Sequence, residues 1–179
     1  MGDPLDNYQK MLHRVKELCQ GIEDTLHEHL NCTKGCSSCC KAFTLFPVEA
    51  VALGAALESL PTERATAIRR YVDEHCNGEK CPLLEDDQCL LYDDRPVICR
   101  THGLPILYVE NGEQRVDCCP INLVQCKSLP GAAVIDLERL NTLLVSVNAQ
   151  FLKQSGISDN IPERFTIAEA VLDSLRPQK

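Results

Sequence analysis

The chain has 179 residues, 44% of them hydrophobic, and a formal net charge of −8 at pH 7. This apolar content is enough for one core, so we expect a single domain covering residues 1–179. The acidic balance argues against a nucleic-acid partner, because phosphate binding requires clustered Lys and Arg. No secretory signal or membrane-spanning apolar run is visible. We therefore expect a cytoplasmic protein with no nucleic-acid or membrane partner.

Amphipathic helices are predicted in the first half of the chain. Apolar residues at steps of three and four predict a helix over residues 5–30, and Cys19 lies on its apolar stripe, where a buried core position is expected. An Ala-rich helix is predicted over residues 47–60, with Pro47 in its first turn. A further helix is predicted over residues 62–75, with Ala65, Ile68 and Val72 facing inward.

Helical spacing returns at the C-terminal end. Residues 136–152 predict a helix, and Thr166 with Glu169 forms a capping box that opens a last helix reaching residue 175. Together with residues 5–30, the segment 136–175 is predicted to flank a metal-binding core over residues 32–126.

Short apolar runs broken by Pro, Gly and acidic residues predict loops and short strands between residues 81 and 126. Residues 106–109 and 114–116 flank Asn111-Gly112, a pair that favours a tight hairpin turn. The predicted fold class is mostly α, with a small β-hairpin and a loop-rich, metal-stapled centre.

Twelve cysteines are the most unusual feature of the composition. A reducing cytosol disfavours structural disulfides, so clustered cysteines in such a chain indicate metal ligands or redox centres. The first group is Cys32, Cys36, Cys39 and Cys40, whose spacing allows a loop to fold its thiolates around one ion or cluster. Later groups contain Cys76, Cys81, Cys89, Cys99, Cys118, Cys119 and Cys126. Of these, Cys76 is expected to be a core residue rather than a ligand.

The adjacent pair Cys39-Cys40 carries geometric information, because neighbouring side chains project in different directions. The pair therefore indicates two neighbouring sites with one thiolate each, or one ligand beside one free thiol. Two four-thiolate sites would need eight ligands, and the clustered cysteines are numerous enough to supply them.

Several spaced motifs resemble one known family. The run C-x-x-x-C-x-x-C-C from Cys32 to Cys40, then Cys81-Pro82-Leu83, Cys89 and the segment Tyr92–Arg100, resembles the YkgJ-like cysteine-cluster family of zinc- or iron-chelating domains. A related cysteine domain occurs in flagellin lysine N-methylases. The resemblance implies the ligands Cys32, Cys36, Cys39, Cys40, Cys81, Cys89 and Cys99, with Arg95, Pro96 and Arg100 as accompanying motif residues. We add Cys119 to complete a larger site.

Arg100 is the predicted cofactor-binding residue. Four thiolates around zinc or an oxidised four-iron cluster leave negative charge, which a guanidinium can offset by hydrogen bonding to sulfur. The alternative is a surface salt bridge with Asp93 or Asp94. His102 is either a substitute ligand or a structural side chain.

The function predicted from the sequence is a metal-binding cysteine-cluster protein that holds an iron–sulfur cluster and has a redox or protein-modification role, with an unidentified protein or redox partner. The alternative is a structural zinc-binding interaction module without catalysis. An iron–sulfur oxidoreductase-type activity is compatible with this prediction, but no catalytic residue is identified. A radical S-adenosylmethionine enzyme is disfavoured because no strand–helix barrel pattern is present. Thiol exchange at Cys39-Cys40 or Cys118-Cys119 is a further alternative.

Overall fold

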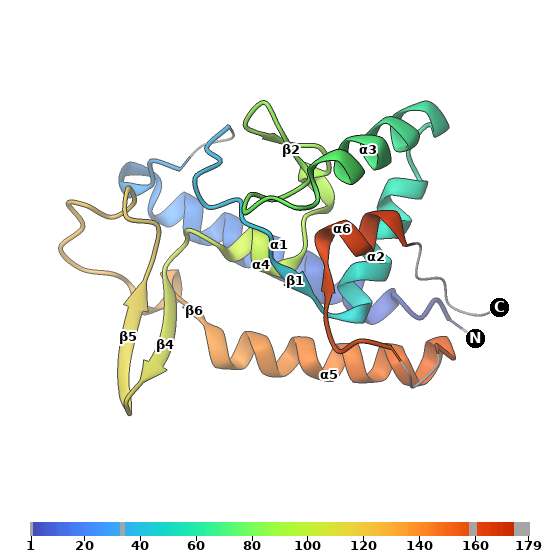
Figure 1. The fold of residues 1–179 in the computed structure, drawn as a ribbon. Coiled ribbons are helices and arrows are strands. Elements are labelled where there is room, and N and C mark those ends of the chain that lie inside the picture. Colours follow the sequence, from blue (N-terminus) through green and yellow to red (C-terminus); the bar gives the residue numbers. More distant parts are fainter. Residues whose placement is uncertain (1, 33–34, 158–160, 174–179) are drawn as a thin grey trace.

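The structure is a computed structural model of the chain and describes residues 2–32, 35–157 and 161–173. Within these residues it contains six α-helices and several short strands (Figure 1). The helices are α1 (Asp6–Thr25), α2 (Pro47–Glu58), α3 (Thr62–His75), α4 (Val97–Thr101), α5 (Leu137–Ser155) and α6 (Ile167–Leu172). The strands are β1 (Thr44–Leu45), β2 (Leu84–Glu85), β3 (Gln88–Cys89), β4 (Ile106–Glu110), β5 (Glu113–Asp117), β6 (Ile135–Asp136) and β7 (Phe165–Thr166).

The three helices predicted in the first half of the chain are present, two of them with shifted ends. The first one stops at Thr25, and the next turn tightens into a 3₁₀ helix over His27–His29. Helix α2 ends at Glu58, ahead of Pro61, because a proline disfavours helical backbone at the residue before it. The prediction of a helix over residues 62–75 is confirmed by α3.

Local capping sets the ends of the last helices. Asp136 accepts a hydrogen bond from the Arg139 amide at the start of α5, and Gly156, with φ of 65°, ends that helix in the left-handed region. The predicted capping box of Thr166 and Glu169 is confirmed at the start of α6. Residue 175, where we placed the end of this helix, lies outside the described residues.

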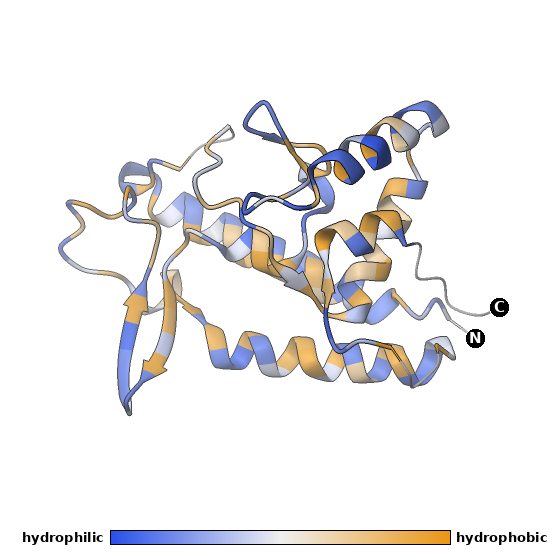
Figure 2. Cartoon of the chain, viewed as in Figure 1, coloured by the Kyte–Doolittle hydropathy of each residue, from blue (hydrophilic) through white to orange (hydrophobic). Residues whose placement is uncertain are grey.

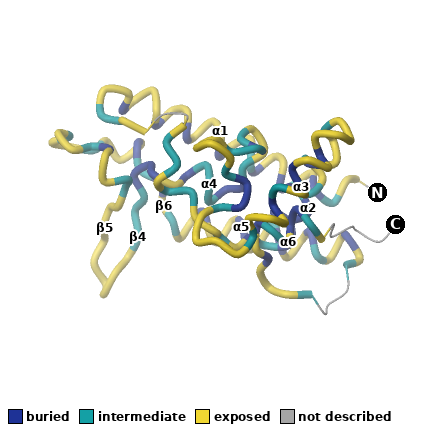
Figure 3. Tube along the Cα trace, turned by 45° about the horizontal axis from the view of Figure 1, so that its top comes forward, coloured by how far each residue is buried: buried dark blue, intermediate teal, exposed yellow. Residues whose placement is uncertain are grey.

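Helix α2 is apolar on all sides and lies between two hydrophobic clusters. Its residues Val48 and Val51 pack into a first cluster with α1, α4 and α5. Leu53 and Leu57 pack into a second cluster with α3 and α6. Figure 2 shows apolar residues on α2 and α6. Figure 3 shows buried residues where α2, α3 and α6 meet.

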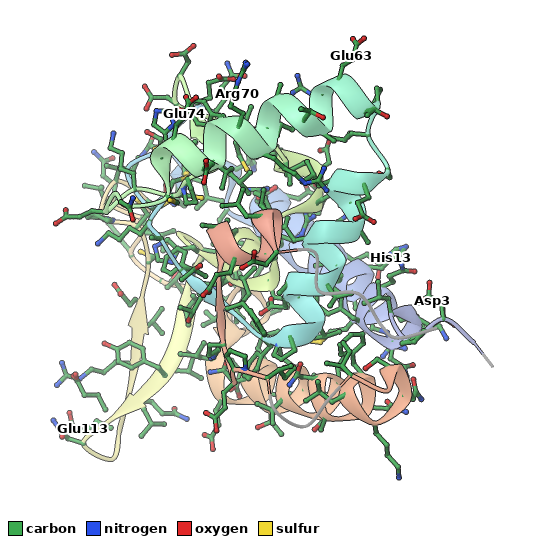
Figure 4. All side chains as sticks on the ribbon, turned by 45° about the vertical axis from the view of Figure 1, so that its right-hand side comes forward. Asp3, His13, Glu63, Arg70, Glu74 and Glu113 are labelled. Atoms are coloured by element: carbon green, nitrogen blue, oxygen red, sulfur yellow. The ribbon has the colours of Figure 1, made fainter. Side chains whose placement is uncertain are left out.

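The predicted orientation of α3 is confirmed. Ala65, Ile68 and Val72 are buried in the second cluster. On the outer side of this helix, Glu63, Arg70 and Glu74 point away from the rest of the molecule (Figure 4).

The predicted β-hairpin is confirmed by β4 and β5, which pair antiparallel around Asn111 and Gly112. Both turn residues have positive φ, 54° and 81°, as a tight turn of this kind requires. The hairpin projects from the helices at the lower left of Figure 1. Strand β6 pairs parallel to β4 and anchors the hairpin next to α5.

A second long-range pairing joins the segments that enter α2 and α6. Strand β1 pairs antiparallel with β7, with Thr44 opposite Thr166 and Leu45 opposite Phe165. This pairing fixes α6 against α2, and its strand β1 directly follows the first cysteine group in the sequence. No helix in the described part of the chain is long and apolar enough to cross a membrane.

Candidate metal centre

Backbone pairing places Cys40 beside Cys81. Lys41 and Lys80 form an isolated antiparallel bridge, and the Cys81 amide donates to the Cys40 carbonyl over 3.1 Å. The Ala42 amide donates to the Glu79 carbonyl on the other side of this bridge. Residues that are distant in sequence thus become neighbours through a short stretch of β-type pairing.

The hairpin formed by β2 and β3 brings Cys89 to the same place. Leu84 lies opposite Cys89, and the Leu84 amide donates to the Cys81 carbonyl over 3.1 Å. The two turn residues, Asp86 and Asp87, both have positive φ, which Asp tolerates better than most residues. As a result, Cys81 and Cys89 both pack against the second hydrophobic cluster.

Helix α4 carries Cys99 and Arg100. Its first amide, at Val97, donates to Glu49 Oε1 over 3.1 Å, and Glu49 Oε2 accepts from the Phe46 amide at the start of α2. The Cys19 thiol on α1 donates to the Arg100 carbonyl over 3.7 Å. Contacts from α1 and α2 therefore fix the short helix that presents Cys99.

Asn122 connects the first cysteine group to Cys119. Its Oδ1 accepts from the amides of Asn31 and Cys32, over 2.9 and 3.0 Å. Its Nδ2 donates to the Gly103 carbonyl over 2.8 Å, and that carbonyl also accepts from the Cys119 amide. This buried side chain therefore holds Cys32 and Cys119 on neighbouring segments.

The cysteine-bearing segments enclose one cavity of about 280 Å³. Its lining contains seven of the eight predicted ligands, which are Cys32, Cys36, Cys39, Cys40, Cys81, Cys89 and Cys99. The eighth, Cys119, is not part of the lining, but its thiol lies close enough to Cys32 to affect that thiol electrostatically. Arg95, Arg100, His102 and Asn122 also line the cavity.

The thiols fall into two sets of electrostatic neighbours. Cys40, Cys81 and Cys89 surround Cys99, and we call these four the inner cysteines. Cys36, Cys39 and Cys119 surround Cys32, and we call these four the outer cysteines. Cys39 also lies next to Cys40, so the adjacent pair connects the two sets.

Burial governs the acidity of the inner thiols. It raises the pKa of Cys40 and of Cys81 to about 11 each. The pKa of Cys99 is raised further, by burial and then by the thiols around it. In the outer set, the Ser38 hydroxyl lowers the pKa of Cys36, whereas burial and the neighbouring Cys36 raise that of Cys32 to about 11.

Two guanidinium groups lie beside the inner cysteines. Arg95 stacks over the Tyr92 ring and donates to the carbonyls of Tyr92 and Cys99. Arg100 donates to the Asp93 backbone carbonyl, and not to the Asp93 or Asp94 carboxylate named in the alternative interpretation. Among the described residues, neither guanidinium forms a salt bridge with a carboxylate. The Arg100 Nε atom is buried and has no hydrogen-bond partner there.

The thiols line the cavity rather than converging on one point. In the parts of the chain that the structure describes, no three His, Cys, Asp or Glu side chains are placed to hold one metal ion. The metal-stapled centre of the predicted fold class therefore stays a prediction. The buried, unpaired Nε atom of Arg100 and the thiol-rich lining suit an anionic thiolate-bound group.

The remaining cysteines lie elsewhere. Cys19 is buried in the first cluster, as predicted. The prediction of a core position for Cys76 is wrong, because this residue belongs to neither cluster nor to the cavity lining and its thiol donates to the Asp73 carbonyl at the end of α3. The thiols of Cys118 and Cys126 contact the carbonyls of Asn122 and Ser128.

Sequence reasoning missed Asn122 and Glu49, which hold the cysteine-bearing segments in place. Neither residue has a spacing that marks its role, because their partners are backbone amides far away in the sequence. His102 lines the cavity with its ring tilted against Phe43, at 5.3 Å between ring centroids.

Comparison with known protein families matches residues 31–120 to CxxCxxCC, described as a "putative zinc- or iron-chelating domain". This match covers half of the chain, and the chain belongs to that family. It agrees with the resemblance read from the cysteine spacing and supports zinc or iron chelation as the activity of the domain. No curated protein and no solved structure matches the chain.

Proposed function

We propose that this chain is an iron–sulfur protein whose cluster lies in the cysteine-lined cavity and serves a redox role. The observation that carries the proposal is the cavity of about 280 Å³, lined by thiols from four separate segments. When bound, a cluster of this kind supplies one-electron chemistry.

Ligand spacing separates an iron–sulfur cluster from a single zinc ion. In a closed zinc site the Zn–S bonds of about 2.3 Å bring four sulfurs to within about 3.8 Å of one another. A multi-iron cluster contains bridging sulfides and holds its cysteine ligands further apart. Thiols spread around a cavity, with no three of the described side chains placed for one ion, suit the cluster better.

Charge also supports a cluster next to α4. An oxidised four-iron cluster with four thiolates carries a net charge of about −2. Arg95 and Arg100 lie beside the inner thiols and form no salt bridge with a carboxylate among the described residues, so they can offset this charge. The Nε atom of Arg100 has a free donor that could bond to a sulfur atom.

The test is iron and sulfide analysis of the full chain purified without oxygen, with optical and spin-resonance spectra. We expect iron and acid-labile sulfide in equal amounts and a brown absorption that bleaches on reduction. Colourless protein with stoichiometric zinc and no sulfide would contradict the proposal. Cys76→Ser serves as the control, because this thiol lies outside the cavity lining.

Structural zinc is the second candidate function. The observation that favours it is the number of thiols, since two sets of four match two closed zinc sites. In that case the metal would tie the loops around Cys36, Cys81 and Cys89 to the helices. Zinc removal would then lower the unfolding temperature, with no redox signal to lose.

A further inference from the structure

The inner and outer cysteines differ in how the fold holds them. Cys40 and Cys81 are joined by a backbone hydrogen bond, Cys89 lies on β3, and Cys99 lies on α4. Cys81 and Cys89 pack against the second hydrophobic cluster. The inner thiols are thus attached to paired backbone and to a helix, and their positions are set by the fold.

The outer cysteines lie on loops. Cys32 is exposed, and in the described residues 35–39 Cys36 and Cys39 lie outside any helix or paired strand. Cys119 lies in a turn after β5. Hydrogen bonds tie these loops to the rest of the fold. The Cys32 amide donates to Asn122 Oδ1, the Ser37 hydroxyl donates to Asp87, and the Cys119 amide donates to the Gly103 carbonyl.

Two guanidinium groups act on the inner thiols. Arg95 and Arg100 both act on the Cys89 thiol, and Arg95 also acts on that of Cys40. Among the described residues, which leave out Lys34, no guanidinium or ammonium group is a leading cause of the pKa shifts of Cys32 and Cys36. Thiolates gathered at the inner site therefore have two guanidinium counter-charges beside them.

We propose that the cavity region contains two separate four-thiolate metal sites, an inner site that retains its metal and an outer site that exchanges it with solvent. The inner site consists of Cys40, Cys81, Cys89 and Cys99, and the outer site of Cys32, Cys36, Cys39 and Cys119. The boundary falls between Cys39 and Cys40, whose side chains leave the backbone in different directions. This inference rests on the proposed function.

Two features explain the difference in exchange. Metal loss requires ligands to move away, and backbone movement at Cys40, Cys81 or Cys99 would break the hydrogen bond between Cys40 and Cys81 or the one at the start of α4. Solvent and competing ligands reach the exposed Cys32 directly. The outer site is therefore suited to release or to accept metal while the inner site keeps the fold intact.

The test uses the full chain loaded anaerobically with sulfide and equal amounts of ferrous and ferric iron, then challenged with an iron chelator. We expect two release phases, each with about half of the iron, because each four-cysteine site holds one cluster. Cys36→Ser should abolish the fast phase and leave the slow one, and Cys76→Ser should keep both. A single phase in the unmodified chain would overturn the inference.

Thiol labelling checks the same inference without any variant. An alkylating reagent added after the fast phase should label Cys32, Cys36, Cys39 and Cys119 and leave the inner four protected, as read by peptide mass spectrometry. Labelling of both sets at equal rates would overturn the two-site inference while leaving the proposed function intact. A chain that takes up no iron or sulfide would contradict both.

Discussion

Asn122 connects the first cysteine group, the turn at Gly103 and the Cys119 segment through one buried side chain. Its amide oxygen accepts from two backbone amides and its amide nitrogen donates to one carbonyl. Such a residue contributes through several partners at once, because each partner would otherwise lack a hydrogen bond.

Replacing this side chain should therefore weaken the fold around the outer cysteines. For Asn122→Ala we expect the free energy of unfolding to fall by about 1–3 kcal/mol, since buried donors lose their acceptor. Urea unfolding measures this change. Asn141→Ala, on the exposed side of α5, is the matched control and should stay close to the unmodified chain. An equal loss in both variants would show that Asn122 has no special role.

Glu49 is a buried carboxylate that accepts from the amides starting α2 and α4. Burial raises its pKa above the usual value of 4.5, despite the opposing effect of these amides. The folded state therefore binds this proton more tightly than the unfolded state does. Its contribution to stability is full below pH 4.5 and is lost as the pH rises through the folded pKa.

Because the pKa of Glu49 is raised in the folded state, we expect the stability of the unmodified chain to fall relative to Glu49→Gln as the pH rises above 4.5. The amide resembles the protonated acid and does not titrate. Chemical unfolding at several pH values between 4.5 and 8 measures the difference. Glu63→Gln, on the outer side of α3, should run parallel to the unmodified chain. A difference for Glu49→Gln that does not change with pH would disprove the assignment.

Residues whose role depends on spacing could be predicted from the sequence, and residues whose role depends on the fold could not. The Cys32–Cys40 run and the later cysteines indicated a cluster, and seven of the eight named ligands line one cavity. Asn122 and Glu49 gave no signal, because the sequence alone does not distinguish an Asn or Glu that binds distant backbone amides from any other Asn or Glu. Their partners become neighbours only after the chain has folded.

At the level of elements, the first cysteine group is held to the β2–β3 hairpin by one side-chain contact. The Ser37 hydroxyl donates to the Asp87 carboxylate in the hairpin turn. Ser38, the next residue, contacts only the Cys36 sulfur among the contacts described for its side chain. These neighbouring serines therefore separate the effect of the hairpin contact from that of the loop itself.

We expect Ser37→Ala to speed amide hydrogen exchange in the hairpin, residues 84–90, because the turn loses its tie to the cysteine loop. Ser38→Ala should leave exchange in this segment unchanged. Exchange read by mass spectrometry on peptides covering the hairpin provides the measurement. Equal acceleration in both variants would mean that the contact of Ser37 with Asp87 does not hold the two elements together.

Long periodic segments were predictable and two-residue strands were not. Helix α3 has the predicted bounds because its apolar residues recur at helical spacing between Pro61 and the following turn. The parallel pairing of β6 with β4 and the pairing of β1 with β7 escaped prediction. Strands of two residues have no alternation to detect, and their partners lie far along the chain.

Across the whole molecule, α2 connects the two hydrophobic clusters. Val51 faces the cluster built on α1 and α5, and Leu53 faces the cluster built on α3 and α6. Both clusters therefore pack against the same helix. Loss of α2 from one cluster removes it from the other, so the two clusters should unfold together. One domain over residues 1–179 stays a prediction.

We therefore expect calorimetry to record one cooperative unfolding transition for the full chain. Leu53→Ala should lower the stability of that single transition by about 2–5 kcal/mol, as for other buried leucines. Val51→Ala should move the same transition by a smaller amount, because it removes less volume from the opposite cluster. Leu143→Ala, at an exposed position on α5, is the control. If Leu53→Ala and Val51→Ala shifted two separate transitions, the clusters would fold independently and the chain would contain two domains.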